Sequence, residues 1–91
     1  MSTHPSYIQN AEIIQSKIGD EVVMLDMASG FYFGLNSVAS VIWQKMKEGI
    51  SFDVLITQLM EEFQVERDLC EKDTRELIDQ LLEKNIIRIV E

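Results

Sequence analysis

The stretch from Asp26 to Trp43 reads DMASGFYFGLNSVASVIW and decides the fold. Its first part, 28–30, favours a turn, and the aromatic residues at 31–33 favour a β-strand. Asn36 can accept a hydrogen bond from the first-turn amides of a helix that follows. The stretch therefore predicts a strand joined directly to a capped helix. At a sheet edge, the backbone groups of such a strand are available to bind a second peptide.

Two turn signals divide the region before Asn36 into three short β-like runs. Gly19-Asp20 separates 11–18 from 21–27, and the turn at 28–30 follows. The middle run is apolar on both faces, as a central strand is, whereas the first is mixed, as an edge strand is. We therefore expect a three-stranded antiparallel meander whose second edge strand runs from Phe31 to Leu35.

After Asn36 the apolar spacing changes from two residues to about 3.6, which is typical of helices. We expect one helix that ends at Gly49, a second over 51–63 and a third over about 67–84. The last apolar segment, 86–90, is β-branched and is expected to add an extended segment to the sheet or to the core. The fold class is thus α+β, of the winged helix-turn-helix kind, with a three-stranded antiparallel sheet packed on three helices.

The chain of 91 residues is long enough for one domain. We assign 1–10 to a flexible N-terminal tail and 11–91 to that domain. Sixteen acidic against eight basic side chains give a net charge of −8, which repels nucleic acid. The longest apolar run, 22–25, is too short to span a membrane, and 1–10 lacks the features of a secretory signal, so a cytoplasmic location is predicted.

The residues that carry enzymatic chemistry are scarce. One histidine stands in the tail, and one cysteine, Cys70, stands in an apolar helical stripe where a buried thiol is expected. Carboxylates one helical turn apart, such as Asp73 and Glu76, are interpreted as solvated neighbours rather than an acid–base pair. We expect no catalytic residue, no metal site and no cofactor.

The segment 30–38, followed by Ile42-Trp43, resembles the aromatic-Gly-Leu-Asn to Ile-Trp signature of the PqqD-like family. These are the precursor-recognition domains for ribosomally made, post-translationally modified peptides. The resemblance covers the chain from about Glu12 to Ile87. Ala39 and Asn85 stand where many relatives have glycine, and both are mild departures because alanine favours helix and asparagine tolerates a left-handed conformation.

The resemblance implies that the leader segment of a precursor peptide adds a strand beside the third strand and contacts the third helix. Leu77 and Leu81, one turn apart, would form an apolar slot, and Glu76 and Gln80 would flank it. For each of these wall residues ordinary packing or solvation is the alternative. The implied peptide-binding residues are Phe31, Tyr32, Phe33, Gly34, Asp73, Glu76, Leu77, Gln80 and Leu81.

The predicted function is to bind a leader peptide and to present it to a separate modifying enzyme or leader peptidase, with lasso-peptide biosynthesis favoured. The nearest alternative is a peptide chaperone for pyrroloquinoline quinone or another radical-enzyme pathway. A winged-helix DNA-binding regulator shares the architecture but would need a basic recognition helix, and the third helix here is acidic. An enzyme that depends on Asp73 is the remaining class.

Overall fold

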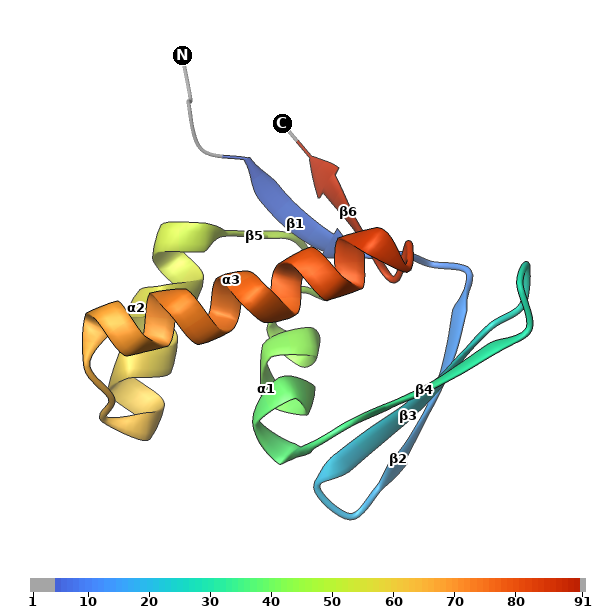
Figure 1. Cartoon of the computed structure of the whole chain (residues 1–91), viewed down its shortest axis with the longest axis horizontal. Coiled ribbons are helices and arrows are strands. Elements are labelled where there is room, and N and C mark those ends of the chain that lie inside the picture. The colour runs from blue at the N-terminus through green and yellow to red at the C-terminus, as the bar shows by residue number, and fades with distance from the viewer. Residues whose placement is uncertain (1–4, 91) are drawn as a thin grey trace.

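The computed structural model describes residues 5–90, with only the backbone described at Phe31. This part of the chain contains six strands and three helices (Figure 1). In chain order these elements are β1 (Ser6–Gln9), β2 (Ile13–Ile18), β3 (Glu21–Asp26), β4 (Phe31–Leu35), α1 (Ser37–Lys45), β5 (Ile50–Ser51), α2 (Phe52–Phe63), α3 (Arg67–Glu83) and β6 (Ile87–Val90).

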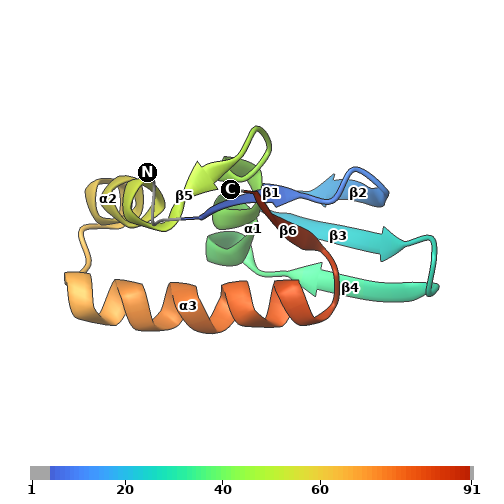
Figure 2. The same cartoon turned by 90° about the horizontal axis from the view of Figure 1, so that it is seen from above.

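The predicted meander is confirmed as an antiparallel sheet in the order β2-β3-β4. The β2–β3 turn contains only Gly19 and Asp20, and Gly19 has φ +62°, a conformation that two-residue hairpin turns require and that glycine adopts readily. The sheet extends away from the helices (Figures 1 and 2). The face that carries Ile14 and Tyr32 is exposed.

A second antiparallel sheet, in the order β5-β1-β6, was not predicted. Its central strand, Ser6–Gln9, lies within the region that we expected to be a flexible tail; the structure differs because these residues pair with β6, and Tyr7 is buried. Residues 1–4 of the expected tail lie outside the described residues. The terminal extended segment is confirmed as β6, which is paired with β1 from the other end of the chain.

The helix caps follow the sequence closely. Asn36 Oδ1 accepts a hydrogen bond from the Ala39 amide at 2.8 Å, and Ser51 Oγ accepts one from the Val54 amide at 3.3 Å. Asn85, after α3, has φ +60°, the left-handed conformation expected of a residue that ends a helix. Within residues 5–90, no helix has the length and apolar character needed to cross a membrane.

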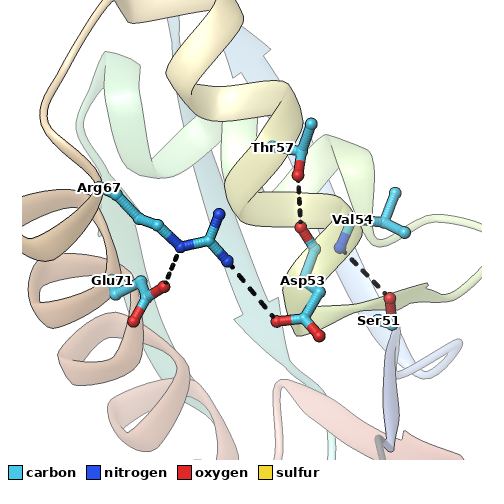
Figure 3. Close-up of polar contacts among 6 residues, drawn as sticks. All are labelled: Ser51, Asp53, Val54, Thr57, Arg67 and Glu71. Atoms are coloured by element: carbon cyan, nitrogen blue, oxygen red, sulfur yellow. Dashed lines mark hydrogen bonds and ion pairs between the residues drawn. The ribbon is translucent and has the colours of Figure 1, made fainter.

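The first turn of α3 is held to the first turn of α2 by a polar network (Figure 3). Arg67 Nε donates to Glu71 Oε2 at 2.6 Å, and Arg67 Nη2 lies 4.0 Å from Asp53 Oδ1. Thr57 Oγ1 donates to the Asp53 carbonyl at 3.0 Å. Because the charged side chains are largely exposed, each ion pair contributes only about 0.2–1 kcal/mol.

The core centres on Trp43, which is fully buried in α1. Its indole Nε1 donates to Gln15 Oε1 of β2 at 2.9 Å, and its carbonyl accepts from Gln9 Nε2 of β1 at 2.7 Å. Trp43 therefore connects the two sheets through hydrogen bonds as well as by packing. Cys70 is buried, as predicted.

Candidate functional site

The open edge of β4 is the first component of the site. β4 pairs with β3 on one side, and no strand among residues 5–90 pairs with its other side. In Figure 2 this free side of the sheet is the one nearer to α3, whereas β2 lies on the far side. Lys84 Nζ, just after α3, lies 5.7 Å from the centre of the Phe33 ring, so the end of this helix stands close to β4.

A buried hydroxyl shows which way the backbone of the β3–β4 hairpin faces. The Val22 amide donates to Ser40 Oγ at 2.9 Å, and Ser40 Oγ donates to the Leu35 carbonyl at 3.2 Å. Val22 and Leu35 are directly opposite each other, so the backbone groups of Val22 point toward β4 and those of Leu35 point toward β3. At the other end, the Gly30 amide donates to the Asp26 carbonyl at 2.7 Å, so this carbonyl of β3 also faces the β4 side.

The direction of the remaining backbone groups of β4 follows from the alternation of an antiparallel ladder. Because Leu35 faces β3, so do Phe33 and Phe31, which are two and four residues earlier. Tyr32 and Gly34 lie between them and turn their amides and carbonyls away from β3, to the open edge. The edge therefore offers the donors and acceptors of two residues to a chain that pairs with it.

The side chains of β4 alternate between the two faces of the sheet. Leu35 is buried, Phe33 is half-buried against the core, and Tyr32 is 70% exposed on the opposite face of the sheet. Gly34 shares the outer face with Tyr32. The side chain of Phe31 lies outside what the structure describes.

An apolar groove is the second component. It has a volume of about 560 Å³ and lies among α1, the end of α2 and α3, starting at Asn36 where β4 ends. Its apolar lining includes Val38, Phe63 and Leu69, which are 48, 37 and 55% exposed. Large apolar side chains with this exposure around one hollow are unusual in a domain that has no partner for them.

Four of the five α3 residues implied by the resemblance line this groove: Asp73, Glu76, Leu77 and Gln80. Leu81 does not line it, and its side chain is fully buried. The buried residues of α3 are Cys70, Thr74, Ile78 and Leu81. Cys70 and Thr74 also line the groove, together with the more exposed residues beside them on the helix, whereas Ile78 and Leu81 do not. Leu77 lines the groove and is half-buried.

Sequence reasoning missed Val38, Phe63 and Leu69 as site residues. Val38 and Phe63 continue the apolar stripes of α1 and α2, so periodicity assigned them to the core. Leu69 is different because it falls outside the buried stripe of α3. An apolar residue at such a position could have indicated a binding surface from the sequence alone.

The chemistry of the groove suits binding. Asp73 and Glu76 place exposed carboxylates at the rim of an apolar floor, a combination that favours a peptide with apolar and basic side chains. Within residues 5–90, no group of histidine, cysteine and carboxylate side chains is arranged to hold a metal ion. The thiol of Cys70 is buried, with Sγ 4.0 Å from Thr74 Oγ1.

A small α+β domain with an open sheet edge beside an apolar groove belongs to the class of strand-accepting recognition domains. Residues 21–87 match the family described as Coenzyme PQQ synthesis protein D (PqqD). This match covers most of the chain, and the chain belongs to the PqqD family.

Two solved structures are similar over nearly the whole chain. One is TbiB1 in complex with the TbiA(beta) leader peptide, with 31% sequence identity, a TM-score of 0.82, and coverage of 89% of this chain and 94% of that chain. The other is lasso peptide synthetase B1 complexed with the leader peptide, with 30% identity, a TM-score of 0.78, and coverage of 90% and 96%. No curated protein matches the chain.

Proposed function

We propose that this chain binds the leader segment of a ribosomally synthesised precursor peptide and presents it to a separate modifying enzyme or leader peptidase of a lasso-peptide pathway. The observation that carries the proposal is the pair of outward-facing residues on β4, Tyr32 and Gly34, beside an apolar groove. Both structural neighbours are complexes with a leader peptide, which supports the same function here. The domain acts in the cytoplasm, where the precursor is made, and has no catalytic activity of its own.

In the proposed complex the leader adds a strand to β4. Its backbone bonds to Tyr32 and Gly34, and alternate side chains enter the groove, as in other cases of strand addition. Leu81 supports the groove from behind without touching the peptide. The proposed contact residues are Tyr32, Phe33, Gly34, Val38, Phe63, Leu69, Asp73, Glu76, Leu77 and Gln80.

Titration of the isotope-labelled chain with a synthetic leader peptide tests the proposal by NMR. We expect amide shifts to be largest in β4 and in 69–80, because these segments form the open edge and the groove wall. Shifts confined to the β5-β1-β6 sheet, or an absence of shifts with every leader tried, would contradict the proposed function.

Leu69→Asp tests the groove within the same titration. Leu69 is 55% exposed, so the variant is expected to fold, but a charge in the apolar lining should weaken leader binding about tenfold. Val54→Asp is the matched control, since Val54 is 49% exposed on α2 and does not line the groove. Equal leader affinity of the two variants would show that the groove is not part of the binding site.

Presentation requires a second surface, and the outer face of the β2-β3-β4 sheet supplies one. Ile14, Leu25 and Tyr32 are directly opposite one another in adjacent strands, and Ile14 is 53% exposed. A leader strand beside β4 would extend this row, so a client enzyme docked on it would contact both the domain and its peptide. An exposed apolar face of this kind is typical of protein interfaces.

Ile14→Glu is expected to slow leader removal by the client peptidase about tenfold while leader affinity stays unchanged, because Ile14 lies two strands from the open edge. Ile89→Glu, on the other sheet with a similar exposure of 51%, is the control. The measurements are peptidase rate with saturating leader, and leader affinity by fluorescence anisotropy. An unchanged rate for Ile14→Glu would exclude this face as the docking surface.

A further inference from the structure

Nothing in the fold of the free chain requires glycine at position 34, within β4. Its φ angle lies outside the left-handed region, and a Cβ built on it meets no atom within 4 Å. Glycine within a strand is less stable than other residues, because it loses more conformational freedom and contributes no side chain to packing. Any small or β-branched residue would fit this position, so the glycine points to something beyond the strand itself.

Gly34 leaves a gap on the outer face of the sheet, beside the apolar side chains of Val23 and Tyr32. Gly34 is opposite Val23 of β3, and Val23 is opposite Ser16 of β2. Tyr32, two residues earlier on the same strand, projects from the same face and is exposed. Between the open edge and the half-buried Val23, only backbone covers the sheet.

A peptide strand that pairs with β4 places one of its side chains at this gap. Residues directly opposite in neighbouring strands project from the same face, and strands lie about 4.8 Å apart. The peptide residue opposite Gly34 is therefore two strand spacings, about 10 Å, from Val23. A long or aromatic side chain of the peptide can lie over the space where Gly34 has no side chain and contact Val23. Such packing over a glycine stabilises glycine residues in sheets.

We propose that the leader residue paired with Gly34 is large and apolar or aromatic, and that it packs over Gly34 against Val23 and Tyr32. Gly34 is then a specificity-determining residue of the open edge, acting by the absence of a side chain. This inference rests on the proposed function, because it requires a peptide strand beside β4.

A double-mutant cycle with Gly34→Val tests the inference. The probes are a synthetic leader peptide that binds the wild-type chain and its set of single alanine variants. We expect Gly34→Val to weaken the parent peptide about tenfold, and one alanine variant to bind the wild type about tenfold more weakly. That same alanine variant should bind Gly34→Val as well as it binds the wild type, because the two changes remove the same contact.

Ser16→Val is the matched control, since it adds the same side chain to the same row on the opposite edge strand, and its leader affinity should equal that of the wild type. Gly34→Ala repeats the cycle with a smaller side chain if the valine variant does not fold. Binding of every peptide by both Gly34 variants at wild-type affinity would overturn the inference and leave the proposed function intact. Failure of all leaders to bind the wild type would instead overturn the proposed function.

Discussion

Tyr32→Pro is expected to weaken leader binding by at least about tenfold while the chain stays folded. Tyr32 turns its amide to the open edge, so proline removes a donor that the peptide would use and places its ring in the path of the added strand. Loss of one main-chain hydrogen bond accounts for roughly 0.5–1.5 kcal/mol, and the steric obstruction adds to this loss. The fold is expected to survive because proline is tolerated where the amide has no partner within the sheet.

Two controls separate the amide from other effects. Tyr32→Thr removes the aromatic ring but keeps the amide and introduces a β-branched side chain that favours a strand, so it should bind more tightly than Tyr32→Pro. Lys17→Pro places proline on the outward side of β2, since its partner Val22 faces β4, and it should leave binding unchanged. Calorimetric titration gives the affinities, and thermal unfolding checks the fold. Equal affinity of Tyr32→Pro and Tyr32→Thr would show that the Tyr32 amide does not bind the peptide.

Leu81→Ala is expected to lower the free energy of unfolding by about 2–5 kcal/mol, which is the usual cost of removing a fully buried leucine side chain. Leu77→Ala is the matched comparison on the same helix, one turn earlier. Its side chain is half-buried and lines the groove, so its effect on unfolding should be smaller and its effect on leader affinity larger.

Urea unfolding and peptide titration of both variants decide between these roles. Under conditions where Leu81→Ala remains folded, its leader affinity should stay close to that of the wild type. A fully stable Leu81→Ala variant with weakened binding would mean that Leu81 contacts the peptide directly, contrary to its burial.

The peptide-binding function agrees with the distribution of charge as well as with the shape of the site. The groove wall on α3 carries Asp73 and Glu76, and the whole chain has a net charge of −8. These charges oppose a phosphate backbone and attract basic side chains of a peptide. α3 therefore does not present the basic surface that a DNA-binding regulator needs on its recognition helix.

Local sequence patterns were sufficient to predict most elements of the fold. The turn at Gly19-Asp20, the apolar central strand and the caps at Asn36 and Ser51 each depend on neighbouring residues, so they could be recognised without a partner. The β5-β1-β6 sheet could not be predicted in this way. Its central strand, Ser6–Gln9, pairs with residues about 80 positions later, and four residues carry no local pattern that specifies so distant a partner.

The candidate site was only partly predictable. The turn signals of the meander predicted that β4 is an edge strand, and periodicity showed that α3 has an apolar stripe. Periodicity could not tell which apolar residues of the helices would be covered, because coverage depends on how α1, α2 and α3 meet. Leu81 was expected in the groove wall but is buried, whereas Phe63 and Leu69 are exposed around the groove.

The amino-acid sequence alone determined the meander, the capped helix after it, and an aromatic strand at the edge of the sheet, because hydrogen bonding and side-chain alternation over a few residues specify them. The tertiary structure decided which two residues of that strand, Tyr32 and Gly34, face outward, and which helix faces form the groove beside them. Both depend on contacts between distant segments, such as the hydroxyl of Ser40 between β3 and β4, which local patterns do not encode.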